Sequence, residues 1–410
     1  MASATLYQQV LDPANRADPY PLYTKMRETP VAREPDGTYV VSTYREIVAL
    51  LHDPRLSSDP HNHPEMAADP QQENPTGLPA DFIRRDPPEH DRLRELATRP
   101  FGPPCSPGRI DGMHPWLAGT TERLIDELGG RDHADIVEDF AYRLPVAAIC
   151  ELLGVPLEDQ PRFHRWADAF VNTFDPGTGT FAERQQERNR VQGELGGYLA
   201  GLIDARAARP GDDLISGMLI DTGPGAPMSR ADLISTSVLL LVAGHETTVN
   251  LITNGMLTLL RHPEILDRLR DEPELSTRLV EELLRFEPPV QMLTNRSALA
   301  DIDVAGTTIP KGAPMALMLA AGDRDPARFP DPDRFDPDRA DNPHLGFGNG
   351  IHYCFGAPLA RVEAQIALPA LARRLRSPRL AADPPPYRPN PILRGPRHLP
   401  IELNGVARGR

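Results

Sequence analysis

Cys354 stands in a glycine-rich segment, directly before a predicted helix. Residues 345–361 read LGFGNGIHYCFGAPLAR. A thiolate just before a helix N-terminus meets free amide hydrogens and the positive end of the helix dipole, which lower its pKa and favour metal ligation. Gly348, Gly350 and Gly356 allow the backbone to approach a flat group closely. A lone cysteine is more often a small buried apolar residue, but this pattern indicates a metal ligand.

A second group of polar residues lies in the middle of a long apolar stretch. Residues 243–248 read AGHETT. The Thr247 hydroxyl can donate to the carbonyl of Ala243, four residues earlier, and widen the helix beside Gly244 enough for a small ligand. Buried polar groups at a helix centre need partners or a purpose. The alternative is that Glu246 and the threonines face a solvated groove.

Two helices must position these groups. The first is predicted to start after Ser229, whose hydroxyl can cap the amide of Asp232, and to end at Arg261. At 1.5 Å per residue it would span roughly 48 Å and must cross the interior. The second follows Cys354, and Pro369 is expected to kink it or end it early.

Strands and composition complete the outline. Residues 39–42 and 301–309 are each predicted as a short strand. The chain has 410 residues with Lys+Arg 44 against Asp+Glu 58, a formal charge of -14, which speaks against nucleic-acid binding. Three scattered cysteines argue against a disulfide framework. No secretory leader or long apolar run is found, so we expect a cytoplasmic protein without a membrane span.

Three motifs, in order along the chain, resemble those of bacterial soluble cytochromes P450. The haem-binding pattern of that family, FGxGxHxCxG, is matched at every fixed position, by Phe347, Gly348, Gly350, His352, Cys354 and Gly356. Residues 243–248 resemble the central-helix motif, and Glu282 with Arg285 resembles the core ion pair. The resemblance implies a mainly α fold with small β-sheets (α+β), one roughly triangular domain over residues 1–410, with the sheets near the N-terminal third.

The resemblance also implies the cofactor and its ligands. Haem b would lie between the long central helix and the helix after Cys354, whose thiolate would bind the iron and favour O–O cleavage. Cationic or hydrogen-bonding side chains would hold the haem propionates; the residues implied here are His90, Arg94, Arg296 and His352. The other cofactor-binding positions implied are Ala243, Phe347, Gly348 and Gly356.

The implied reaction inserts one oxygen atom from O2 into a C–H or C=C bond. Thr247 would orient water while Glu246 relays protons. Two electrons would come from a soluble ferredoxin and its reductase, with Arg361 and Arg92 as candidate contacts. The structural pair Glu282 and Arg285 would be completed by Arg334, with Arg339 as the alternative.

The substrate is expected to be a largely apolar small molecule, because the positions implied to face it are mostly aliphatic. These positions are residues 56–85, Leu239, Val242, Ala243, Val290, Met292, Leu293 and Ile392 or Leu393. A bacterial natural-product intermediate, such as a polyketide, terpenoid or peptide, is our interpretation. Two rivals remain: a haem-thiolate enzyme that performs oxidative coupling, desaturation or peroxide-driven oxidation, and a haem-based gas sensor or carrier.

Overall fold

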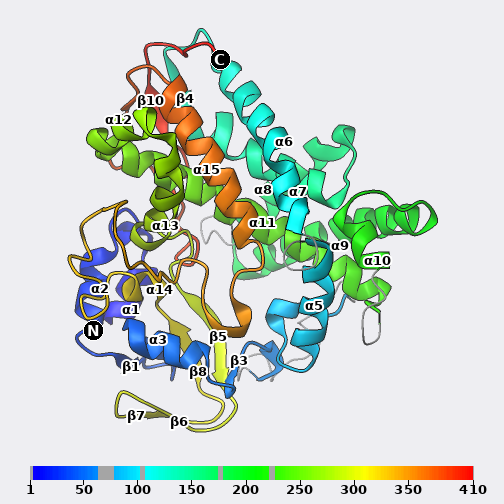
Figure 1. The fold of residues 1–410 in the computed structure, drawn as a ribbon. Coiled ribbons are helices and arrows are strands. Elements are labelled where there is room, and N and C mark those ends of the chain that lie inside the picture. The colour runs from blue at the N-terminus through cyan, green and yellow to red at the C-terminus, as the bar shows by residue number, and fades with distance from the viewer. Residues whose placement is uncertain (1–2, 63–77, 102–106, 174–178, 221–226, 410) are drawn as a thin grey trace.

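A computed structural model describes residues 3–62, 78–101, 107–173, 179–220 and 227–409 (Figure 1). The helices are α1 (Leu6–Leu11), α2 (Tyr20–Met26), α3 (Tyr44–Leu51), α5 (Glu89–Phe101), α6 (Pro107–Asp126), α7 (Arg143–Leu153), α8 (Gln160–Asn172), α9 (Phe181–Ala208), α10 (Leu214–Ile220), α11 (Arg230–Arg261), α12 (Pro263–Asp271), α13 (Ser276–Phe286), α14 (Leu319–Gly322) and α15 (Ala357–Arg374). The strands are β1 (Val31–Arg33), β2 (Tyr39–Val41), β3 (Leu56–Ser57), β4 (His133–Asp135), β5 (Leu293–Ala298), β6 (Ile302–Val304), β7 (Thr307–Ile309), β8 (Pro314–Leu317), β9 (Arg379–Leu380) and β10 (Pro400–Glu402). The predicted mainly helical α+β class is confirmed.

The central helix α11 has the predicted boundaries. The Ser229 hydroxyl accepts from the amide of Asp232, whose carboxylate accepts in return from the Ser229 amide, so that two free donors are satisfied at the start of the helix. Residues 233–241 are buried, because α7, α9 and α15 pack around α11. Figure 1 shows α11 at the centre of the helical part of the molecule.

Helix α15 follows Cys354 and carries Pro358 in its first turn, as predicted. The expectation that Pro369 ends this helix early is wrong, because α15 continues to Arg374. Proline removes one backbone hydrogen bond inside a helix. Residues 367–372 are buried, and tertiary packing of a buried helix outweighs its local propensity.

The sheets draw on both halves of the chain. The largest has the order β1-β2-β8-β5-β3, in which β2 and β8 are parallel and the other pairs antiparallel. A second sheet has the order β4-β10-β9. The placement of the sheets near the N-terminal third is therefore only partly right. The single strand predicted over 301–309 is a hairpin, β6 and β7, since Ala305 and Gly306 turn the chain with φ of 49° and 77°.

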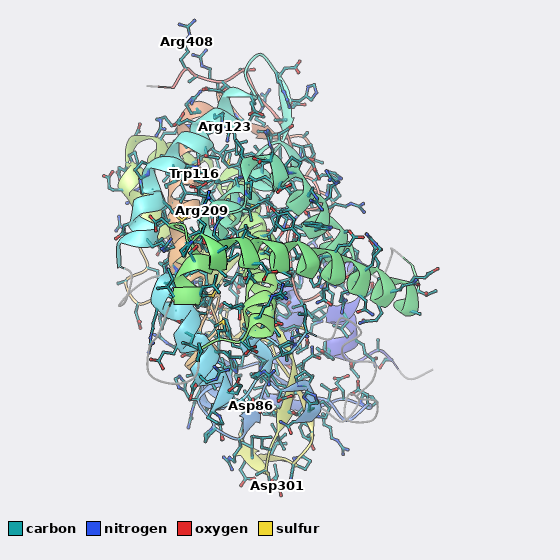
Figure 2. The ribbon with its side chains drawn as sticks, turned by 90° about the vertical axis from the view of Figure 1, so that its right-hand side faces the viewer. Asp86, Trp116, Arg123, Arg209, Asp301 and Arg408 are labelled. Carbon is teal, nitrogen blue, oxygen red and sulfur yellow. The ribbon has the colours of Figure 1, made fainter. Side chains whose placement is uncertain are left out.

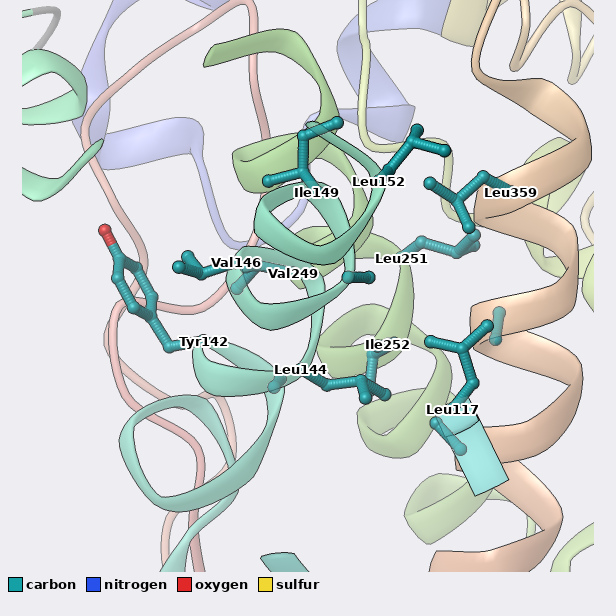
Figure 3. Close-up of a cluster of buried hydrophobic side chains, with 14 of the residues drawn as sticks. Leu117, Tyr142, Leu144, Val146, Ile149, Leu152, Val249, Leu251, Ile252 and Leu359 are labelled. Atoms are coloured by element: carbon teal, nitrogen blue, oxygen red, sulfur yellow. The ribbon is translucent and has the colours of Figure 1, made fainter. Parts of the chain in front are cut away.

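Aliphatic side chains join α7 to α11 in the interior. Figure 3 shows Leu144 and Ile149 of α7 near Leu251 and Ile252 of α11, with Leu359 of α15 beside them. Polar side chains cover the periphery, and Figure 2 shows the β6–β7 end and the C-terminal end at opposite extremes of the molecule. Within the described residues, every helix is too short or too polar to span a bilayer.

Candidate active site

A cavity lies between α11 and the cysteine loop, which we define as residues 345–356. It holds about 1310 Å³ of space, its open mouth included, and is lined mostly by aliphatic and aromatic side chains. Because its lining residues come from both α11 and the cysteine loop, a ligand in this cavity can contact both elements at once.

The cysteine loop brings the Cys354 side chain to the cavity wall. Gly348 and Gly350 have φ of 68° and 67°, values that glycine adopts without strain. A Cβ at Gly350 would lie 2.0 Å from the carbonyl oxygen of Leu51. The Cys354 amide donates to the carbonyl of Phe347 at 2.8 Å and closes the loop. Glycine at position 350 is thus required for the close approach of this loop to α3.

Burial dominates the electrostatics of the Cys354 thiol. The amides of Gly356 and Ala357 and the charges of Arg94 and Arg361 favour the thiolate, but burial outweighs them and raises the pKa of the thiol above its ordinary value. The expectation of a lowered pKa is therefore wrong for the protein without a metal. A metal cation reverses this balance, since a coordinated thiol is deprotonated outright.

Cationic and hydrogen-bonding side chains gather at the edge of the cavity. Arg94, Arg296 and His352 line it, and the ring of His90 lies behind His352 with 4.4 Å between ring centroids. Arg94 donates to the carbonyl of Tyr353 at 2.6 Å. Among the described residues, Arg296 donates to backbone carbonyls alone, those of Asn295 at 3.3 Å and Thr294 at 3.4 Å. The structure therefore brings together the four residues that the sequence implied for the propionates.

Among the described residues, this cluster has one carboxylate contact, between His90 Nδ1 and Asp91 Oδ1 at 2.8 Å. Burial lowers the pKa of Arg296 to about 10, with partial compensation from Asp86. Burial, with the nearby charges of His90, Arg296 and Arg94, lowers the pKa of His352 to about 3. In the described part of the chain, Arg94 and Arg296 have no carboxylate partner, and the buried atoms His90 Nε2 and His352 Nδ1 have no hydrogen-bond partner. These groups suit an anionic ligand with carboxylates.

The residues present fit haem b. The Cys354 sulfur can ligate iron, and the cationic cluster can hold two carboxylates. Gly356 lines the cavity, and a Cβ placed on it would meet no atom within 4 Å, so this side of the loop leaves room for a flat macrocycle. Ala243, Phe347 and Gly348 line the same cavity.

Thr247 lies on the α11 wall of the cavity, with Ala243. Its hydroxyl donates to the Ala243 carbonyl at 2.8 Å, the bond that the sequence predicted. Glu246 is 2 % exposed, accepts from Arg388 at 2.8 Å and from Asn250 at 3.2 Å, and is not among the lining residues. The alternative of a solvated groove around Glu246 is therefore wrong.

The positions implied to face substrate divide into two groups. Leu239, Val290 and Leu293 line the cavity together with Ala243, whereas Val242, Met292 and Ile392 are not among the lining residues. Met292 is fully buried in a separate cluster against which Ile392 packs, so the sequence-based placement of both is corrected. Neighbouring residues point to opposite sides of an extended segment, which sequence alone could not orient here. Residues 63–77 of the expected 56–85 loop lie outside the described residues.

Several lining residues were missed by sequence reasoning. Phe82 and Ile83 fall in the expected 56–85 loop, but Phe101 of α5, Ile149 of α7 and Glu363 of α15 were not among the predicted site residues. Glu363 is 1 % exposed and shares a helix face with Leu359, four residues earlier. An acidic residue on an otherwise apolar helix face is the signal that could have identified it.

The core ion pair forms with a different third partner. Arg285 donates to both carboxylate oxygens of Glu282, at 2.8 and 2.7 Å, and both side chains are buried. The prediction of Arg334 is wrong for its side chain, which is 70 % exposed and lies 3.8 Å from Asp336, although its backbone carbonyl accepts from Arg285 at 3.1 Å. Arg339, the alternative, lies 3.4 Å from Glu282.

The arginines suggested for partner binding are both ion-paired. Arg361 contacts Glu281 at 2.7 and 2.9 Å and lies over the ring of Phe347. Arg92 contacts Glu89 at 2.7 Å. Each charge is therefore partly compensated within the chain.

One cavity carries the Thr247 hydroxyl, the Cys354 thiol and a cationic cluster that suits carboxylates, a combination that fits a haem-thiolate oxygenase. Comparison with known proteins agrees with this class. The family model described as Cytochrome P450 matches residues 38–399, so the chain belongs to the cytochrome P450 family. Members carry haem b and act on small molecules with O2 and redox partners.

The relatives are bacterial monooxygenases. The chain is 41% identical over 399 residues to the cytochrome P450 monooxygenase PikC of Streptomyces venezuelae, covering 94% of this chain and 91% of the relative. It is 38% identical to the mycinamicin IV hydroxylase/epoxidase of Micromonospora griseorubida, covering 92% and 94%. The crystal structure of ligand-free Mycobacterium smegmatis CYP164A2 superposes with a TM-score of 0.87 at 40% identity, covering 97% and 99%. The protein is a P450 monooxygenase.

Proposed function

We propose that this monooxygenase hydroxylates or epoxidises a bulky, largely apolar natural product of the macrolide kind. The cavity carries the proposal, because the side chains that line it beside the haem-binding residues are mostly aliphatic and aromatic, which suits a largely apolar substrate. One relative is a hydroxylase/epoxidase of mycinamicin IV. The match over residues 38–399 supports one domain across 1–410.

Different residues of the cavity have different functions in the proposed mechanism. Bound haem supplies oxygen activation, promoted by electron donation from a thiolate. Cys354 would hold the iron, and Arg94, Arg296 and His352 would hold the carboxylates. The aliphatic wall, including Leu239, orients the substrate and excludes water.

Protons follow a separate route along α11. Thr247 lies on the cavity wall, and its hydroxyl can exchange the 2.8 Å bond to Ala243 for a bond to water. Glu246, the preceding residue, can hold a proton on its carboxylate and release it towards Thr247. The two electrons would come from a ferredoxin and its reductase, and the region around Arg361 is the surface that we propose for that contact.

The test uses the purified holoprotein with mycinamicin IV as probe, a ferredoxin and its reductase. We expect a substrate-induced change in the haem spectrum and a product with one added oxygen atom. Leu239→Phe should weaken probe binding at least about tenfold by filling the cavity, an effect of about 1.4 kcal/mol. Met292→Leu is the matched control, since that side chain lies outside the cavity. Absence of binding by macrolides, with turnover of smaller apolar molecules, would refute the substrate class.

The rival functions predict different results. A peroxide-driven or coupling enzyme would form product without ferredoxin, or without adding oxygen. A gas sensor or carrier would bind CO and O2 but oxidise none of the apolar probes. In Thr247→Ala, we expect reducing equivalents to be consumed without product. Unchanged coupling of electrons to product in this variant would contradict the relay.

A further inference from the structure

Arg388 pairs with Glu246, and neither side chain is among the residues that line the cavity. Arg388 belongs to a segment that we call the C-terminal loop, residues 384–396. Its Nη1 donates to Glu246 Oε1 at 2.8 Å, and its side chain keeps 15% exposure against 3% for Glu246. Arg388 is therefore the member of the pair that is more accessible to water.

The C-terminal loop is fixed to α11 around this ion pair. Asn250 donates to the same Glu246 oxygen at 3.2 Å, and a Cβ at Gly395 would lie 2.1 Å from Asn250 Oδ1, so the loop backbone rests directly on this side chain. Asn254 donates to the carbonyl of Arg394 at 3.0 Å. These contacts set the position of Arg388 independently of its charge.

The guanidinium can turn without leaving the site. Its carbon lies 5.9 Å from the centroid of the Tyr142 ring, and its Nε has no hydrogen-bond partner among the described residues. Figure 3 shows Tyr142 at the start of α7, with its hydroxyl directed away from the aliphatic cluster. A guanidinium has five N–H donors, so Arg388 can contact water while another donor stays on Glu246.

We propose that Arg388 is a positioning residue for proton delivery, which keeps Glu246 ionised between transfers and connects it to solvent. This inference rests on the proposed relay role of Glu246. A cation 2.8 Å from a carboxylate favours its ionised form, and one opposite charge at this distance typically lowers a carboxyl pKa by about 1 to 3. Among the described residues, His245 precedes Glu246 on α11, and its ring lies 4.3 Å from that of Tyr142, which also faces the Arg388 guanidinium.

The same loop reaches the substrate wall. Leu393 forms a bridge with Val290, and Val290 lines the cavity. The C-terminal loop thus carries both the ion-pair partner of Glu246 and a residue that contacts the cavity wall.

The experiment uses the holoenzyme with its electron donors. It measures the pH profile of coupling, which is the fraction of the supplied electrons that is used to form product. Arg388→Gln removes one positive charge, so Glu246 ionises at higher pH. We expect the acid limb of this profile to move up by about 1 to 3 pH units. Arg388→Lys should restore the profile. Infrared spectra should show the carbonyl band of protonated Glu246, which is identified by its absence in Glu246→Gln. In Arg388→Gln, this band should persist to higher pH than in the wild type.

The outcomes separate this inference from the proposed function. The CO difference spectrum and the unfolding midpoint of each variant show whether the fold is intact. If Glu246→Gln leaves coupling unchanged, the relay role itself fails. If Glu246→Gln uncouples the enzyme but Arg388→Gln leaves the pH profile and the infrared band in place, the Arg388 proposal alone is overturned. Added to Glu246→Gln, Arg388→Gln should have no further effect on coupling.

Discussion

The substitution Glu363→Gln should stabilise the protein in a pH-dependent manner. Glu363 lies on α15, is 1 % exposed and faces the cavity. Its Oε2 has no hydrogen-bond partner among the described residues, and burial raises its pKa from 4.5 to about 8. A buried carboxyl without a partner remains protonated because its charged form cannot be solvated.

The magnitude follows from the two pKa values. The unfolded chain releases this proton near pH 4.5, and the folded protein releases it near pH 8. Between these values the folded state binds more protons, so the free energy of unfolding falls as pH rises. At 1.36 kcal/mol per pKa unit, a difference of about 3.5 amounts to about 5 kcal/mol as an upper limit. Glutamine has similar shape and does not titrate.

The assay is urea unfolding of the holoprotein, followed by circular dichroism at several pH values between about 4.5 and 9. Near pH 4.5 both side chains are uncharged, and the two proteins should have similar stability. The advantage of Glu363→Gln should then grow with pH and level off above about pH 8. The control Glu264→Gln makes the same change at an exposed site on α12 and should shift stability by less than about 0.5 kcal/mol. A difference between wild type and Glu363→Gln that stays constant with pH would refute the reasoning.

Two further predictions concern the scaffold. Arg285→Ala leaves the buried carboxylate of Glu282 without its main partner and should lower the free energy of unfolding in urea by about 3 to 5 kcal/mol. The control Arg334→Ala changes an exposed side chain and should lower it by less than about 0.5 kcal/mol. Equal losses in the two variants would contradict the assignment. Gly350→Ala places a Cβ 2.0 Å from a backbone oxygen and should lower haem retention, as measured by the CO difference spectrum. The control Gly306→Ala is also at positive φ, but its Cβ would meet no atom within 4 Å. This control should keep its full haem content.

Local sequence signals predicted the elements that carry the chemistry. The capping residues of α11 and the glycines before Cys354 act within a few residues, so their effects can be read directly from the chain. The contact of Arg388 with Glu246 joins residues 142 positions apart, and no periodicity indicates it. The exchange of Arg334 for Arg339 depends on how an irregular segment turns, which the residue types leave open.

The parallel pairing of β2 with β8 has a consequence for how the chain is made. Residues 39–41 find their partner only at 315–317, after most of the chain has left the ribosome. Strand pairs so distant in sequence form late, because a long loop must close before any contact rewards it. The cysteine loop, which rests on the carbonyl of Leu51, follows still later. The haem site is thus completed only when the cysteine loop has packed against the N-terminal part of the chain. Nascent chains that end before this loop therefore cannot retain the cofactor.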